Sequence, residues 1–204
     1  RAVNFAGIPG EYSSPIVSTA TAGSAPVNIA APFLNLSAGG LTFAWGDGGN
    51  AAGTGYNLEL STNSSFSAPV SSDVTTNLNY VFTGLFANTT YYAHVRAVGA
   101  GGNYTAYTGT LSTVTYALAP VVTSLPFTSI STTSFTFNWS DGGNPLNTRY
   151  AAEISRNNFD TMTASAATLS ASAAFSGLTP NTVYQARVKA VNFLGVDGPY
   201  STPI

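Results

Sequence analysis

The sequence predicts an all-β protein of tandem sandwich domains, each with about seven strands and a period of about 94 residues. Short segments in which apolar and polar residues alternate are rich in β-branched and aromatic residues and are separated by Gly, Pro, Asn and Asp. No stretch long enough to form a helix has helical periodicity. In addition, AWGDGGN at 44–50 recurs as NWSDGGN at 138–144, which places Trp45 and Trp139 94 residues apart. Repetition at domain length indicates consecutive copies of one fold.

The repeat continues over nearly the whole chain. After one deletion, YYAHVRAV at 91–98 aligns with YQARVKAV at 184–191, and the opening stretch 1–16 closely copies the final stretch 189–204. The chain therefore resembles a window on a tandem array, out of phase with the repeat. We expect the last strands of a preceding repeat, one complete repeat and a second repeat with a curtailed last strand, at residues 1–25, 26–118 and 119–204.

Individual strands of the two repeats also match. LTFAW at 41–45 and FTFNW at 135–139 place their large apolar residues on one face, because successive strand residues point to opposite faces. YNLELS at 56–61 and YAAEIS at 150–155 each follow a turn rich in Gly and Asn. Both repeats therefore predict the same succession of strands.

One segment carries a more specific pattern. GLTPNTVYQARVKAVN at 177–192 resembles the fibronectin type III module, in which a Leu-x-Pro-x-Thr-x-Tyr corner precedes an Arg-Val-x-Ala-Val-Asn strand. The resemblance implies a buried tryptophan on the second strand and a tyrosine corner at the sixth. The first repeat has Ala87 where Pro180 stands, which predicts a looser corner. The implied structural core comprises Trp45, Leu85, Tyr91, Trp139, Leu178 and Tyr184.

Composition excludes several classes of function. Charged residues are only 7% of the chain and the net charge is −2, so there is no basic surface for nucleic acid. The lack of cysteine excludes disulfides and thiolate metal sites, and no apolar run is long enough to predict a transmembrane segment. No signal sequence marks the start, so we expect Arg1 to follow an upstream sequence. Weak charge repulsion permits self-association.

The sequence predicts a non-catalytic protein without a cofactor. His94 is the only histidine, and a single histidine on a strand supplies neither a metal cluster nor a catalytic triad. Glu59 and Glu153 occupy equivalent positions in different repeats, so they do not form a carboxylate pair within one module. No nucleophile elbow, phosphate-binding loop or zinc-protease motif is present.

The repeated Asp-Gly-Gly-Asn loops allow two interpretations. Asp47, Asn50, Asp141 and Asn144 could offer oxygen ligands to Ca²⁺, but each loop has one carboxylate and the ion takes six to eight ligands. A turn is the simpler interpretation, because Asp and Asn bond their own backbone and Gly supplies positive φ.

Two further groups of residues are candidates for surface functions. Five Asn-x-Ser/Thr sequons make glycosylation possible, at Asn35, Asn63, Asn88, Asn103 and Asn138. Aromatic residues in or near the loop between the last two strands could contact a sugar or, in the favoured interpretation, a neighbouring module: Tyr104, Tyr107, Phe193 and Tyr200.

These observations favour a structural function. Repeats joined by short Pro-containing links at Ser24–Val27 and Leu118–Val121 predict a stiff rod in a secreted or surface-anchored fibre, with copies of itself or neighbouring repeats as partners. A long covalent array is the favoured route of assembly. Strand addition, in which residues 17–25 of a neighbour complete the sheet after Ile204, is the other.

The alternative is a spacer or an adhesion module that binds a cell-surface glycan or protein. Near-equal repeat lengths favour the scaffold over this alternative. The Cys-free composition, rich in Ser and Thr, suggests a bacterial, extracellular protein.

Overall fold

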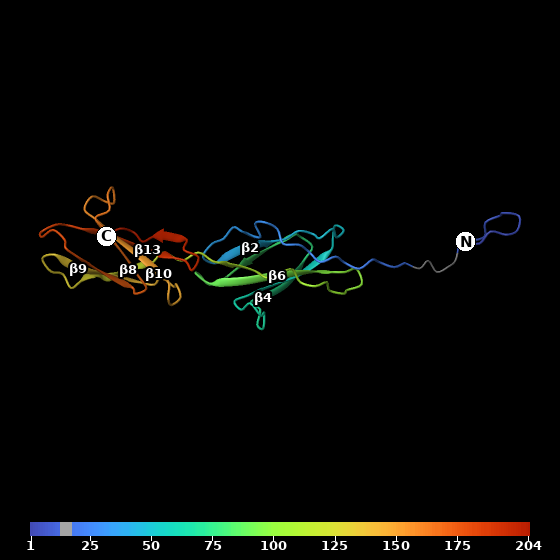
Figure 1. Cartoon of the computed structure of the whole chain (residues 1–204), viewed down its shortest axis with the longest axis horizontal. Helices are drawn as coiled ribbons and strands as arrows, with labels where there is room; N and C mark the ends of the chain where they lie inside the picture. Colours follow the sequence, from blue (N-terminus) through green and yellow to red (C-terminus); the bar gives the residue numbers. More distant parts are fainter. Residues whose placement is uncertain (13–17) are drawn as a thin grey trace.

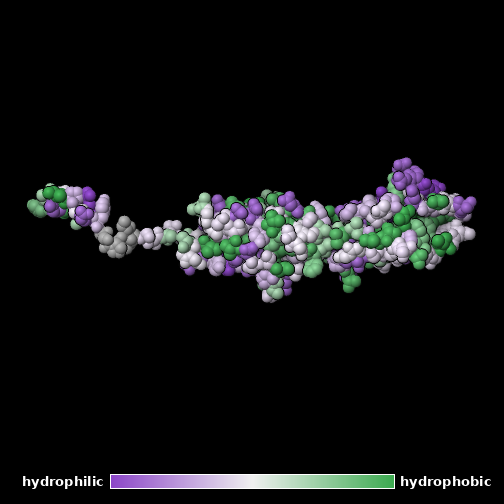
Figure 2. Space-filling view, turned by 180° about the vertical axis from the view of Figure 1, so that it is seen from behind, coloured by the Kyte–Doolittle hydropathy of each residue, from purple (hydrophilic) through white to green (hydrophobic). Residues whose placement is uncertain are grey.

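A computed structural model describes residues 1–12 and 18–204. Two β-sandwiches follow one another in an elongated arrangement, and the N-terminal segment extends away from the first sandwich, at the end opposite the second (Figure 1). Apolar and polar residues are mixed over the visible face of both sandwiches (Figure 2). Among the described residues there is no helix, and so none with the length and hydropathy to cross a membrane.

The first sandwich consists of two antiparallel sheets. The three-stranded sheet has the order β1-β2-β5 and the four-stranded sheet the order β4-β3-β6-β7. The strands are β1 (Phe33–Leu34), β2 (Gly40–Ala44), β3 (Gly55–Ser61), β4 (Ser71–Thr75), β5 (Asn79–Thr83), β6 (Thr90–Val98) and β7 (Leu111–Val114).

The second sandwich repeats this topology strand for strand. Its sheets have the orders β12-β9-β8 and β11-β10-β13-β14. The strands are β8 (Val121–Thr128), β9 (Ser134–Ser140), β10 (Arg149–Ser155), β11 (Ala164–Thr168), β12 (Ser172–Ser176), β13 (Gln185–Val191) and β14 (Asp197–Tyr200). The all-β tandem sandwich predicted from the sequence is confirmed.

Each sandwich has its own core between the two sheets. In the first, Trp45 lies between Phe43 and Tyr56, with ring centroids 5.5 and 5.8 Å away. In the second, Trp139 lies 5.2 Å from Phe137 and 5.8 Å from Tyr150. The indole nitrogens of both tryptophans are buried without a hydrogen-bond partner, so these side chains contribute through apolar packing.

Both sandwiches contain a tyrosine corner, in which a tyrosine hydroxyl is hydrogen-bonded to a backbone amide five residues earlier. The hydroxyl of Tyr91 accepts a hydrogen bond from the amide of Phe86 at 2.9 Å, and that of Tyr184 accepts one from Thr179 at 3.0 Å. The prediction that Ala87 loosens the first corner is therefore wrong, because its hydrogen bond is as short as that of the second corner. Leu178 belongs to the core of the second sandwich and Tyr184 is partly buried against that core, while Leu85 is partly buried against the core of the first.

The opening residues fold like their copy near the end of the chain. Asn4 Oδ1 accepts hydrogen bonds from Ala6 and Ile8, as Asn192 Oδ1 does from Leu194 and Val196. The copied sequence therefore forms the same turn in both places. The hydrogen bonds of this turn join residues at most four positions apart, which explains why it forms without the rest of a sandwich.

Candidate inter-module interface

The Asp-Gly-Gly-Asn loops form tight turns. Asp47 Oδ1 accepts a hydrogen bond from Gly49 N at 2.8 Å, and Asp141 Oδ1 accepts one from Gly143 N at 2.9 Å. Each turn presents the amide side chain of its final asparagine towards the link that enters the sandwich. We call residues 47–50 and 141–144 the linker clamps.

Each clamp binds its link through the side-chain oxygen and the side-chain nitrogen of its asparagine, which contact the N–H and the C=O of a single link residue. The Asn50 amide accepts from Ser24 N and donates to Ser24 O, both at 2.8 Å. The Asn144 amide does the same with Leu118, at 2.8 and 2.9 Å. A two-point contact fixes the orientation of the link as well as its position.

Glycine is required inside the clamps. Gly48 and Gly142 both have a φ of +68°, which residues with a Cβ rarely adopt. An added Cβ would also overlap the carbonyl oxygen of Ala25 or Ala119, respectively. The clamps therefore depend on the close approach of the link to bare backbone.

The four oxygen-bearing residues considered for Ca²⁺ thus have another role here. Asp47 and Asp141 stabilise the turns, and Asn50 and Asn144 bind the links. Within the described parts of the chain, no group of three His, Cys, Asp or Glu side chains is placed to hold a metal ion.

A buried polar network joins the two sandwiches. Asn88, with no exposed surface, donates from Nδ2 to Thr148 Oγ1 at 2.9 Å and accepts from Phe193 N at 2.8 Å. Thr148 is also buried and donates to Pro145 O at 2.6 Å. Asn192 adds a longer hydrogen bond to Thr115 O at 3.4 Å. These contacts, called the joint below, link residues that belong to neither core.

The joint changes the interpretation of two sequence features. The sequon at Asn88 lies in the joint, where a glycan would be incompatible with the buried amide contacts. Phe193 contributes its backbone to the joint, while its side chain remains about half exposed. Of the four aromatic residues considered for module packing, it alone donates a hydrogen bond to the other sandwich among the described residues.

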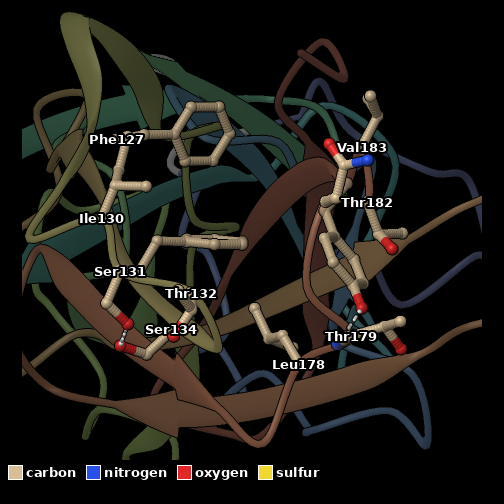
Figure 3. A pocket seen from close by; sticks show the side chains of 12 residues that line it. Phe127, Ile130, Ser131, Thr132, Ser134, Leu178, Thr179, Thr182 and Val183 are labelled. Atoms are coloured by element: carbon tan, nitrogen blue, oxygen red, sulfur yellow. Dashed lines mark hydrogen bonds between the residues drawn. The ribbon is translucent and has the colours of Figure 1, made fainter.

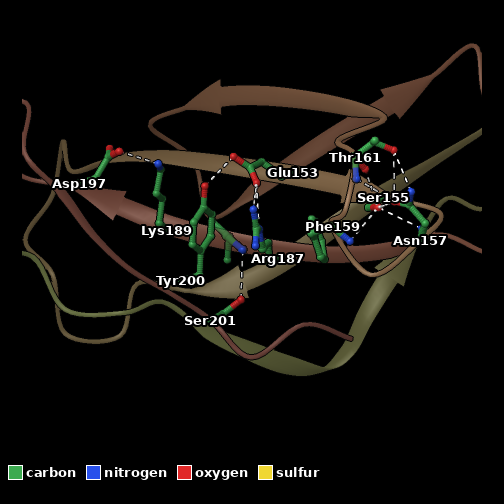
Figure 4. Close-up of polar contacts among 11 residues, drawn as sticks. Glu153, Ser155, Asn157, Phe159, Thr161, Arg187, Lys189, Asp197, Tyr200 and Ser201 are labelled. Carbon is green, nitrogen blue, oxygen red and sulfur yellow. Dashed lines mark hydrogen bonds and ion pairs between the residues drawn. The ribbon is translucent and has the colours of Figure 1, made fainter.

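The other three aromatics pack on their own sheets. In the second sandwich, Arg187 lies between Phe159 and Tyr200, with centroids 4.1 and 4.0 Å from its guanidinium carbon (Figure 4). Glu153 accepts from Arg187 Nε at 2.9 Å and from the Tyr200 hydroxyl at 2.6 Å. We call this stack a ladder; Lys189 extends it over the other side of Tyr200.

The first sandwich builds the same ladder around a histidine. His94 stacks between Phe66 and Tyr107, at 3.6 and 3.7 Å. Arg96 then lies 4.4 Å from the Tyr107 ring and 3.8 Å from that of Tyr104. Glu59 contacts His94 Nε2 and the Tyr107 hydroxyl, both at 2.9 Å. The separate glutamates of the two repeats therefore serve separate ladders.

The ladder shifts the acidity of its members. Burial, followed by the hydrogen bond to Glu59, raises the pKa of Tyr107 to about 12. Burial alone would raise the pKa of Glu59, but hydrogen bonds from His94 and Tyr107, with the nearby positive charges, lower it overall. These shifts favour an ionised Glu59, which accepts the hydrogen bonds, and a protonated Tyr107, which donates one.

The comparisons with known proteins agree with this architecture. The model of the fibronectin type III domain family matches residues 120–204, which span the second sandwich. This part of the chain is similar to fibronectin type III domains. A two-domain fibronectin type III segment of chicken tenascin has a TM-score of 0.50 at 12% identity, covering 89% of this chain and 97% of that one. At this identity the likeness is one of fold: two fibronectin type III sandwiches in tandem.

A second solved structure, of the FN1–FN3 domains of chicken CNTN1, has a TM-score of 0.38 at 19% identity and covers 89% of this chain and 66% of that one. A search of curated proteins found no match.

Proposed function

We propose that the chain is a non-catalytic structural segment of an extracellular or cell-surface fibre, in which sandwiches follow one another head to tail. Fibronectin type III domains are generally non-catalytic structural or adhesion modules of multidomain proteins, and they typically occur in extracellular or surface proteins. The repeated clamp is the main observation in favour. Both sandwiches hold the link before them by the same two-point asparagine contact.

The joint supports the same proposal. A flexible tether needs no buried contacts, whereas Asn88 of the first sandwich and Thr148 of the second are both buried and are hydrogen-bonded to one another. A buried polar group is costly unless its partners are in place, so the joint favours one relative orientation. Repeated along an array, whether covalent or completed by strand addition, such joints give a stiff rod.

Labelling tests the proposal directly. Antibodies raised against residues 1–204 are expected to decorate filaments on the source cells at regular intervals in electron micrographs. The denatured native polypeptide, sized by gel and mass spectrometry, then separates a long covalent array from subunits of about 21 kDa. Diffuse label without filaments would contradict the fibre.

A second function, adhesion through a surface glycan or protein, is favoured by one observation. Tyr104 is 54% exposed and stacks on Arg96, so it presents a flat aromatic face to solvent. Glycan-array binding by the chain that is lost in Tyr104→Ala, with Tyr12→Ala as the matched exposed control, would support adhesion. Equal binding by both variants would contradict it.

A further inference from the structure

The second sandwich has an apolar groove at the end that faces away from the first. The groove has a volume of about 400 Å³ and lies between the loop that follows β8 and the corner before β13 (Figure 3). Its apolar lining comes from Phe127, Ile130, Phe135, Leu178, Val183 and Tyr184. Ile130 and Val183 are 73% and 84% exposed, so the described chain leaves these walls open to solvent.

The first sandwich covers the equivalent place with its own chain. After β7, Thr115 Oγ1 donates to Phe86 O at 2.7 Å and accepts from Thr89 N at 3.0 Å. Tyr116 N donates to Ser37 O at 3.0 Å. Thr115 and the corner residue Tyr91 are both fully buried as a result.

In the second sandwich, the residues equivalent to those that bind Thr115 and Tyr116 in the first sandwich line the groove. Ser131, Thr179 and Thr182 line it at the places that Ser37, Phe86 and Thr89 take in the first. Tyr184, the equivalent of Tyr91, is only partly buried. The groove therefore has the shape and the backbone groups to receive a strand like Val114–Ala117.

The chain contains a second segment with that sequence pattern. STATAGSAP at 18–26 aligns with STVTYALAP at 112–120, so Thr21 corresponds to Thr115. Residues 18–25 lie outside any strand and are mostly exposed. Three positions separate Thr115 from the clamped Leu118, and three separate Thr21 from the clamped Ser24. A strand seated by Thr21 would thus enter its own clamp with the same spacing.

We propose that Ser18–Ala25 of a second copy of this chain fills the groove by strand addition. This inference rests on the proposed head-to-tail fibre and names its contact. Within one molecule the segment lies beyond the first sandwich, at the opposite end from the groove, so closure on itself is excluded and the contact propagates (Figure 1).

The central pair of the joint, Asn88 and Thr148, has a counterpart on each side of this contact, whereas Asn192 corresponds to Gly99. Asn181 takes the place of Asn88 with a similar φ, +51° against +45°. Thr54 of the arriving copy takes the place of Thr148 and makes the same internal contact, from Oγ1 to Ala51 O at 2.7 Å. The Asn181 amide would then bind Thr54 as Asn88 binds Thr148.

Sedimentation of the 204-residue chain over a concentration series tests the contact. We expect oligomers that lengthen with concentration and that an excess of the peptide STATAGSAP shortens. Ala22→Pro removes the N–H equivalent to that of Tyr116, and Ile130→Asp places a charge in the groove. Each is expected to weaken association about tenfold or more. Glu11→Pro and Leu169→Asp, at exposed positions outside the strand and the groove, are the matched controls.

Mixing the two variants sharpens the test. Ala22→Pro keeps a working groove and Ile130→Asp keeps a working strand, so their mixture should form one-to-one dimers and no longer species. A monomer at all concentrations, without peptide binding, would overturn the inference. The inference would also be overturned if the native polypeptide were far longer than this chain and filled the groove with its own residues. That result would not contradict the proposed fibre. Absence of filaments on cells would instead contradict the fibre alone.

Discussion

The two sandwiches share their strand order, clamps and ladders, but they differ at the tyrosine corner. In the first, the chain beyond β7 covers Tyr91 completely. In the second, the equivalent Tyr184 lines an open groove. The corner hydrogen bonds are nevertheless alike, at 2.9 and 3.0 Å. The corner therefore forms from its own loop, while its burial depends on a further strand.

Removal of the core tryptophans is the strongest test of how alike the sandwiches are. Trp45→Ala and Trp139→Ala should each destabilise their own sandwich by about 3–5 kcal/mol, through the cavity left in the core. No hydrogen bond is lost, because neither indole nitrogen has a partner. Each variant keeps one tryptophan, so fluorescence during denaturant unfolding follows the unmutated sandwich and circular dichroism follows both. An unchanged melting temperature in either variant would contradict its core assignment.

The second largest effect is expected at the joint, where Asn88 makes contacts that its counterpart Asn181 lacks among the described residues of one molecule. Asn88→Gly should cost about 2 kcal/mol, because Thr148 and the amide of Phe193 lose a buried partner. Glycine tolerates the positive φ of this position, so backbone strain does not confuse the result. Small-angle scattering should show a wider range of angles between the sandwiches.

Asn181→Gly is the matched control for the joint. Asn181 has the same backbone conformation but is exposed, so we expect a loss below about 0.5 kcal/mol in the monomer. Equal effects of the two variants would show that the joint contacts add nothing to the stability of the fold.

The tyrosine corners should differ less. Tyr91→Phe and Tyr184→Phe each remove one hydrogen bond to a backbone amide, worth about 1 kcal/mol. The loss should be larger for Tyr91, since water cannot replace its hydroxyl at a fully buried site. Chemical denaturation of the two variants measures the difference, and a neutral result for both would argue against the corners as a source of stability.

Much of this architecture could be predicted from the sequence, because its signals are local. Alternation in LTFAW and FTFNW gives the buried face of a strand, and the repeat of the Trp45 loop at Trp139 gives the period. The Asp-Gly-Gly-Asn loops could be predicted as turns for the same reason, since Asp47 bonds within its own loop.

The contacts between modules could not be predicted in this way. Asn50 binds a link 26 residues before it, and Asn88 binds Thr148 60 residues after it. Asn88 carried only the signal of a sequon, which describes two neighbours and not a partner in another domain. The ladders could not be predicted either, because Phe66, His94 and Tyr107 meet only when three separate segments pack together.

The ladder of the first sandwich gives the smallest expected effect, a dependence on pH. The pKa of Glu59 in the folded protein lies below its ordinary value of 4.5. Ionised Glu59 therefore stabilises the fold above about pH 4.5, and this contribution is lost as the pH falls through the lower, folded pKa. We expect a change of less than about 1 kcal/mol, because the side chain is partly exposed to solvent. In the Trp139→Ala background, where fluorescence follows Trp45 alone, Glu59→Gln should remove this part of the acid dependence. In the Trp45→Ala background, where fluorescence follows Trp139 alone, the same change should leave the profile as it is. An identical acid profile in the variant would show that the contact with His94 and Tyr107 does not stabilise the folded state.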